Sequence, residues 1–156
     1  MSLNHIQVLA AVREALAQPG AWAQEDTARD ASGEPVRPSS PEAVCFCLWG
    51  ALSLFSAQPG WAGAVAALDR VLVAVQGIGA GIPTWNDTPG RTHAQVLALL
   101  DYVIGTEVAI ARASWIDPGE PTCGGANSLH EWNDAKERTH AEVLEAFDRV
   151  IGEPTT

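Results

Sequence analysis

Apolar residues recur every three or four positions in several stretches of the chain, which is the spacing of an α-helix with one buried face. The first stretch opens at Asn4, with Gln7 three residues later, and ends before the Pro19-Gly20 pair. Another covers Trp61 to Val75, where Asp69-Arg70 marks the polar side. We predict that both stretches are helices.

A helix is also expected from Ser39 to about Ala57. Ser39 and Glu42 have the spacing of a capping box, and Pro41 stands near the first helical position, where its missing N–H costs nothing. Within it, Ala43 to Phe55 is uncharged but shorter than the roughly 20 residues that a membrane-spanning helix needs. We therefore expect a buried core helix and no membrane segment.

Two stretches break the helical pattern. From Ala21 to Ser40 the periodicity stops, and the Asp30-Ala31-Ser32-Gly33 turn signal is followed by two prolines, so a loop or a short hairpin is expected. Gly77 to Pro83 carries three glycines and one proline, which predicts a loop that delivers Trp85.

The C-terminal half contains an internal repeat. Residues 85–104 read WNDTPGRTHAQVLALLDYVI and residues 132–151 read WNDAKERTHAEVLEAFDRVI, with twelve of the twenty positions identical. In each copy a threonine, Thr92 or Thr139, precedes Gln or Glu by three residues, so each copy is predicted to be a loop, a capping box and a helix. A separate helix is expected from Thr106, as its cap, to Trp115.

Length and composition fit one domain. The chain has 156 residues, of which 47% are hydrophobic and 18% are charged, enough apolar material for a packed core. Two copies of a repeat are too few for a stable solenoid, so the repeat is expected to pack on the earlier helices. The prediction is an all-α, single compact domain over residues 1–156, with five to six helices and an irregular or hairpin segment near residues 21–40.

Net charge and cysteine content limit which partners and which cellular location to expect. The net charge of −10 opposes binding to nucleic acid or to an anionic membrane surface. It is uneven, at −3 over residues 1–78 and −7 over residues 79–156. Three cysteines do not suit a secreted disulfide framework, and the N-terminus lacks the pattern of a signal peptide, so a cytoplasmic location is expected.

Three segments resemble a bacterial family of domains of unknown function. They are the ARD-x-x-G-x-P-V stretch at Ala28 to Val36, the A-V-x-x-C-L-x-G-A-L pattern at Ala43 to Leu52, and the W-N-D-x-x-x-R-T segment at Trp85 to Thr92. The resemblance covers roughly residues 4–104, and the second W-N-D copy looks like an added or degenerate repeat. It implies a shared fold and no particular reaction.

The cysteines are candidates for a nucleophile and for metal ligands. Cys45 and Cys47 stand near a helix start, with His93 and His140 as possible bases, but the predicted helix places both thiols at the end of its first turn or beyond. Their apolar neighbours favour an inert, buried role. Cys123 stands alone, and no paired spacing typical of zinc is present, so we expect no metal site.

The doubled W-N-D-x-x-x-R-T-H motif is the main candidate for a site. In a binding interpretation, its polar groups converge around a shared cleft. In a structural interpretation, each Trp anchors a loop in the core, each Asn-Asp satisfies backbone donors in a turn, and each Arg pairs with its Asp. We favour the structural interpretation, because a duplicated unit must keep its folding residues in both copies. The residues that would bind a ligand are Trp85, Asn86, Asp87, Arg91, His93, Trp132, Asn133, Asp134, Arg138 and His140.

The function that these observations favour is a non-catalytic binding or protein-interaction module without a cofactor, whose partner is a protein or a small molecule. One alternative is a small hydrolase or transferase in which His93 or His140 is the base and Asp87 or Asp134 orients it. At a helix start, each histidine is expected to be neutral and able to accept a hydrogen bond. Another alternative is an acidic decoy or immunity-type protein that covers a basic partner.

Overall fold

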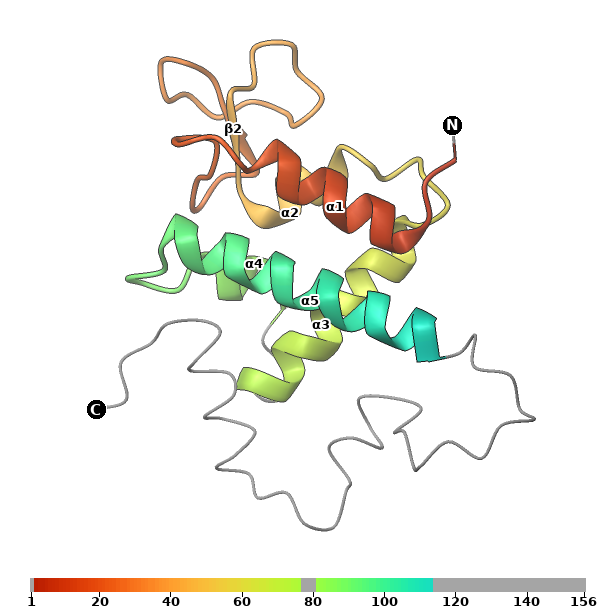
Figure 1. The fold of residues 1–156 in the computed structure, drawn as a ribbon. Helices are drawn as coiled ribbons and strands as arrows, with labels where there is room; N and C mark the ends of the chain where they lie inside the picture. The colour runs from red at the N-terminus through yellow and green to blue at the C-terminus, as the bar shows by residue number, and fades with distance from the viewer. Residues whose placement is uncertain (1, 77–80, 114–156) are drawn as a thin grey trace, which may run out of the picture.

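The computed structural model describes residues 2–76 and 81–113, and in that part the chain forms five helices and one two-stranded sheet (Figure 1). This confirms the mainly helical fold class. The elements in chain order are α1 (His5–Ala15), β1 (Ala28–Arg29), β2 (Cys45–Phe46), α2 (Leu48–Ser53), α3 (Trp61–Gln76), α4 (Ile82–Asn86) and α5 (His93–Ala113).

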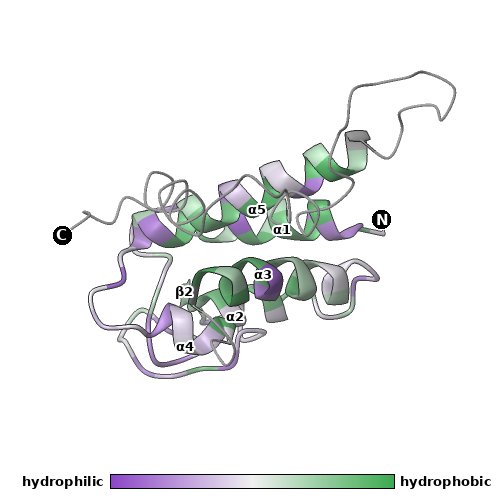
Figure 2. Cartoon of the chain, turned by 90° about the horizontal axis from the view of Figure 1, so that it is seen from below, coloured by the Kyte–Doolittle hydropathy of each residue, from purple (hydrophilic) through white to green (hydrophobic). Residues whose placement is uncertain are grey.

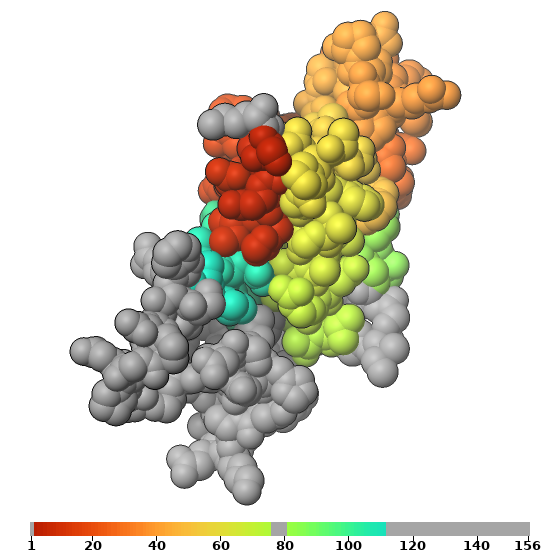
Figure 3. Space-filling model, turned by 90° about the vertical axis from the view of Figure 1, so that its right-hand side faces the viewer, coloured from red at the N-terminus to blue at the C-terminus, as the bar shows by residue number. Residues whose placement is uncertain are grey.

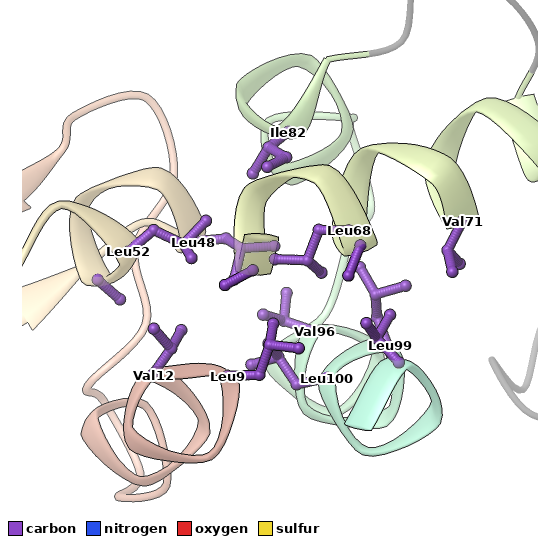
Figure 4. Packing of buried hydrophobic residues seen from close by; sticks show 14 of the residues in the cluster. Leu9, Val12, Leu48, Leu52, Leu68, Val71, Ile82, Val96, Leu99 and Leu100 are labelled. Atoms are coloured by element: carbon purple, nitrogen blue, oxygen red, sulfur yellow. The ribbon is translucent and has the colours of Figure 1, made fainter. Parts of the chain in front are cut away.

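The helices form two layers around an apolar core. Helices α1 and α5 lie side by side in one layer, and α2, α3 and α4 lie in the other (Figure 2). Side chains of both layers point toward one another between them (Figure 4). Each fully buried leucine stabilises the fold by about 1.5–3 kcal/mol. The largest buried aliphatic side chains are Val8, Leu9, Val12, Leu16, Leu48, Leu52, Leu68, Leu72, Ile82, Leu99 and Leu100.

Capping boxes are present at two of the predicted helix starts, and the one at α5 was itself predicted. At α1, the Asn4 Oδ1 accepts from the Gln7 N–H at 2.9 Å, and the Gln7 Oε1 accepts from the Asn4 N–H at 3.0 Å. At α5, the Thr92 Oγ1 accepts from the Gln95 N–H at 3.3 Å, and the Gln95 Oε1 accepts from the Thr92 N–H at 2.9 Å. The helices predicted to open at Asn4 and Trp61, and the first helix of the repeat, are therefore confirmed.

The helix predicted from Ser39 to Ala57 is wrong over its first half. The helix there is α2, which begins at Leu48 with Cys47 as its N-cap. Residues before it are extended, because Phe46 donates its N–H to the Ala21 carbonyl and accepts from the Ala23 N–H, and Cys45–Phe46 pairs with β1. Tertiary pairing with a segment twenty residues earlier thus overrides a local helix-start signal. The expected burial also fails at Val44, which is 53% exposed.

Two further boundaries differ from the prediction. Trp85 and Asn86 do not follow a loop but lie in the short helix α4, whose second residue is Pro83. Thr106 does not cap a new helix, because α5 continues through it and its Oγ1 donates to the Tyr102 carbonyl at 3.0 Å. Val103 and Glu107 are both buried and stand four residues apart, so the same face of α5 stays inside the protein past Thr106.

The segment between α1 and α2 contains the hairpin that the sequence allowed. Arg29 bridges Pro35, and the Asp30 carboxylate accepts from the Ser32 hydroxyl and from the N–H groups of Ser32 and Glu34. These bonds hold the pKa of Asp30 below its usual range. Gly33, at φ +88°, supplies the left-handed turn.

Several predictions lie outside the described residues. They concern Cys123, the end of the helix expected to reach Trp115, and the second copy at residues 132–151. The single domain over residues 1–156 stays a prediction. Of the described helices, α5 has one stretch, His93–Ala111, that is long and apolar enough to cross a membrane by length and composition. Four of its residues, Val96, Leu99, Leu100 and Val103, lie in the core, and a packed core helix has the same composition.

Candidate functional site

Asn86 is the centre of the first W-N-D motif. Its side chain is fully buried, and its Oδ1 accepts from the Trp22 indole N–H at 2.8 Å and from the Leu48 N–H at 3.0 Å. Its Nδ2 donates to the Ala23 carbonyl at 3.1 Å and to the Asp87 carboxylate at 2.7 Å. An amide side chain has two donors and an acceptor with two lone pairs, so Asn86 uses its full hydrogen-bonding capacity inside the fold.

Asp87 and Gln24 add to this network at the surface. The Asp87 Oδ1 accepts from the Glu25 N–H at 2.9 Å. Glu25 has φ +74°, which is unfavourable for a residue with a side chain, so the bond helps to hold a strained turn. The Gln24 Nε2 donates to the carbonyls of Asn86 and Thr88 at 2.8 and 3.2 Å. The Asn-Asp pair satisfies backbone donors as predicted, but these are the N–H groups of Leu48 and Glu25, far along the chain, and not donors of a local turn.

Trp85 and Arg91 form a buried stack. Trp85 is 1% exposed and Arg91 is 8% exposed. The guanidinium carbon of Arg91 lies 4.0 Å from the centre of the indole ring, and the Arg91 Nε donates to the Trp85 carbonyl at 3.3 Å. The cation–π contact and the hydrogen bond both turn Arg91 back onto its own motif.

His93 is the first residue of α5 and is tied to the end of α1. Its Nε2 lies 2.6 Å from the Leu16 carbonyl oxygen, and its ring stacks on Trp22 with 6.1 Å between centroids and 11° between planes. Because a carbonyl only accepts, this nitrogen donates. An imidazole that donates through Nε2 can still accept through Nδ1, so the expectation of a ring able to accept a hydrogen bond stays a prediction.

The arrangement of these groups does not form a catalytic pair in the described residues. No hydrogen bond joins His93 to Asp87 in that part of the chain, since the histidine donates to Leu16 and the carboxylate accepts from Glu25 and Asn86. Nor do any three His, Cys, Asp or Glu side chains of the described segments lie close enough to share a metal ion. The predicted residues Trp132, Asn133, Asp134, Arg138 and His140 lie outside the described residues.

The sequence reasoning missed the partners of the motif. Trp22 and Gln24 are more than sixty residues away from Asn86 along the chain and belong to the segment without periodicity. No local pattern connects them with the W-N-D motif. The one feature of the sequence that could have pointed to them is chemical. An indole and a primary amide both need hydrogen-bond partners when they are buried.

The two cysteines of the first half differ in environment. Cys47 is buried, and its Sγ accepts from the Gly50 N–H at 3.3 Å as the N-cap of α2. The argument that it lies beyond a first helical turn is therefore wrong, yet burial raises the pKa of its thiol and so disfavours the thiolate. Cys45 is half-buried, with its Sγ 4.0 Å from the Arg29 carbonyl. Both are free thiols.

Comparison with known families identifies the family of this chain. A family of unknown function, DUF6197, has a model that matches residues 2–106 and, separately, residues 107–153. The chain belongs to this DUF6197 family. No curated protein and no solved structure showed a match.

The first DUF6197 match contains every described residue of the Asn86 network, from Leu16 to His93. The second match includes the W-N-D copy at residues 132–151. The division between the two matches, after residue 106, falls within the continuous helix α5. Helix α5 therefore extends from the first matched segment into the second.

Proposed function

We propose that this protein is a non-catalytic protein-interaction module that binds its partner through residues 30–44. This segment runs from the end of β1 to the start of β2, and none of residues 31–46 is buried. It stands out from the helical body as two turns in Figure 1 and as a protrusion in Figure 3. Long connections without regular structure in compact domains are commonly binding loops.

The observation that carries the proposal is that this exposed segment is held in one shape. Its base is closed by bonds from the Val36 N–H to the Ala28 carbonyl at 3.0 Å and from the Val44 N–H to the Arg29 carbonyl at 2.9 Å. The Asp30 turn orders one half, and a bond from the Ser40 N–H to the Arg37 carbonyl orders the other. A preorganised loop loses less conformational entropy on binding than a flexible one.

The W-N-D motif supports the proposal as an anchor. Asn86, Asp87 and their neighbours bind residues 22–25, which lead directly into β1. In this proposal the motif fixes the root of the projecting segment, and the segment meets the partner. The engagement of His93 and Asp87 with other groups speaks against the hydrolase or transferase alternative.

Charge supports a partner with a basic contact face. The chain carries −10 overall, and the segment itself has Asp30, Glu34 and Glu42 against Arg37. Opposite charge speeds encounter and selects among partners more than it adds affinity. Val44, which is 53% exposed, supplies an apolar contact at the end of the segment.

The test compares two exposed valines. The unaltered chain, Val44→Arg and Val73→Arg are each immobilised, and the proteins that each retains from a lysate of the source cells are compared. Val73 is the control, because it lies on α3 and is 45% exposed. We expect one partner to be retained by the unaltered chain and by Val73→Arg, and to be lost at least about tenfold with Val44→Arg, because a long cation replaces an apolar contact. Equal retention by both variants would show that the segment is not the binding surface.

A further inference from the structure

Residues 81–104, which contain the first W-N-D copy, lie on a surface made by α1, α2, α3 and the segment between α1 and β1. Figure 4 shows Val96, Leu99 and Leu100 of α5 packed in the core between α1 and α3. Ile82 of α4 is buried in the same core. We call this surface the docking surface, and the residues through which it hydrogen-bonds to the first copy include Arg13, Leu16, Trp22, Ala23, Glu25 and Leu48.

Four side chains of the first copy make these hydrogen bonds. Asn86 and Asp87 bind residues 22–25 and Leu48, as described above. The His93 Nε2 donates to the Leu16 carbonyl, and the Arg13 Nε donates to the Asp101 Oδ1 at 2.9 Å. These four groups are spread over the loop and the helix, so together they favour one sequence pattern over other apolar helices.

The second copy, 47 residues later, keeps all four of these side chains, and it keeps apolar residues at the buried positions of Ile82 and Val96. These side chains of the first copy contact segments outside the copy. Their presence in the second copy therefore points to a surface of the same kind. The corresponding residues are Leu129, Asn133, Asp134, His140, Val143 and Asp148.

The part of the chain that the structure describes holds one docking surface. It is built from three helices of 11, 6 and 16 residues and from the segment that follows the first of them. Between the described end of α5 and Trp132, the sequence offers residues 114–131, which are too few to build a second surface of this kind. Up to residue 151 the chain thus carries two copies and one surface that fits them.

We propose that the docking surface also binds residues 128–151 of the same chain, in place of residues 81–104. Binding of the second copy releases the first, so the difference between the two copies sets the balance. The second copy has Ala146 and Phe147 at the positions of the buried Leu99 and Leu100. Because a shortened side chain leaves a cavity and a larger one strains the core, the first copy is favoured by at least about thirtyfold.

The tether favours the second copy of the same chain over that of another molecule. Residues 77–127 join α3 to the second copy, and a tethered segment has an effective concentration on the order of millimolar. Another chain at micromolar concentration competes poorly with it. The exchange concerns the anchor of residues 30–44 and not their contact with a partner, so it does not depend on the proposed function.

The repeat provides a matched pair of variants for the test, made in the full chain. Val96→Asp places a carboxylate in the core position of the first copy, and Val143→Asp makes the same change at the same position of the second. Val143→Asp alone should leave the midpoint of urea unfolding unchanged. Val96→Asp should lower the midpoint and keep a cooperative transition, because the second copy takes over. Adding Val143→Asp to Val96→Asp should abolish that transition.

A third variant covers the case in which the second copy binds too weakly to maintain the fold. Ala146→Leu with Phe147→Leu, added to Val96→Asp, gives the second copy the core side chains of the first. Absence of a cooperative transition in this variant would overturn the proposal. So would a Val143→Asp change that has no effect in the Val96→Asp chain, or an equal loss from each single variant.

NMR of the histidine rings identifies which copy is bound. The His93 ring stacks on Trp22, so the indole shifts its ring protons in the unaltered chain. In Val96→Asp, we expect this shift to pass to the ring protons of His140, identified by their loss in His140→Gln. Light scattering should find a monomer. A His140 signal without the shift, or a dimer that appears with Val96→Asp, would overturn exchange within one chain.

Discussion

The Asn86 side chain makes four hydrogen bonds in the described site, and an isosteric substitution tests their contribution to stability. Asn86→Asp replaces its two N–H donors by an oxygen that faces the Ala23 carbonyl and the Asp87 carboxylate. We expect a loss of about 3–5 kcal/mol in the free energy of unfolding, as for other buried charges without a partner. Urea denaturation followed by circular dichroism measures it.

The control for that prediction is Asn4→Asp. Asn4 is an N-cap, and Asp performs this role equally well, so its free energy of unfolding should change by less than about 0.5 kcal/mol. Equal effects at the two positions would contradict the central role of Asn86.

The thiol of Cys47 should show its raised pKa in labelling. Because burial raises the pKa, a smaller fraction is thiolate at a given pH, and the inflection of the labelling rate lies above that of a free cysteine. A pKa of the Cys47 thiol that is higher in the folded than in the unfolded state also affects stability. The contribution of this thiol to the free energy of unfolding is present at low pH and is lost as pH rises through the folded-state pKa. Iodoacetamide labelling of Cys123→Ser, followed by mass spectrometry, should find Cys45 modified before Cys47. Faster labelling of Cys47 would argue for a reactive thiol.

At the scale of residues, the sequence predicted what the motif residues do better than it predicted which groups they contact. The indole of Trp85 is buried and Asn86-Asp87 satisfies backbone donors, as the structural interpretation of the motif expected. The identity of those donors, in residues 22–48, depends on contacts far apart in the chain. His93 shows the limit, since its Nε2 donates to the Leu16 carbonyl, which only the fold brings near.

At the scale of elements, two variants distinguish the threonine that caps α5, Thr92, from the threonine inside the helix, Thr106. Thr92→Ala removes the Oγ1 that accepts from the Gln95 N–H, and should lower the free energy of unfolding by about 1 kcal/mol. Thr106→Ala removes only a bond to the Tyr102 carbonyl and favours helix, so stability should be unchanged or rise by about 0.5 kcal/mol. Thermal and urea melts should therefore show a loss of stability for Thr92→Ala and none for Thr106→Ala. A loss at Thr106 comparable to that at Thr92 would contradict the continuous helix.

Local signals located elements where no distant segment competed for the backbone. The starts of α1 and α5 were predicted because the cap and its partner stand three residues apart. The start of α2 was not, because the Phe46 N–H donates to the Ala21 carbonyl, the Phe46 carbonyl accepts from the Ala23 N–H, and Gly50 packs against the Thr27 backbone. A Cβ on Gly50 would lie 1.7 Å from the Thr27 carbonyl oxygen. These pairings cannot be read from the order of residues 39–57.

At the scale of the whole molecule, Glu107 connects the two layers. It lies on α5 and binds His5 of α1 and Arg70 of α3, so three helices share one carboxylate. It also lies just past the end of the first DUF6197 match, at residue 106. The fold that begins in the first matched segment therefore uses at least one residue of the second.

Two fragments, residues 1–113 and residues 1–106, test where the folding unit ends. Among the described residues, every member of the buried core cluster lies between Val8 and Val103, so residues 1–113, which keep α5 as described, should fold with cooperative urea unfolding. Residues 1–106 lack Glu107, which leaves His5 and Arg70 without this partner. We expect this fragment to be less stable by about 2 kcal/mol, a value reduced for the exposure of both partners. Circular dichroism of both fragments beside the full chain measures this difference. If residues 1–113 fail to fold, residues beyond 113 contribute to the core, and the folding unit extends into the second copy of the repeat.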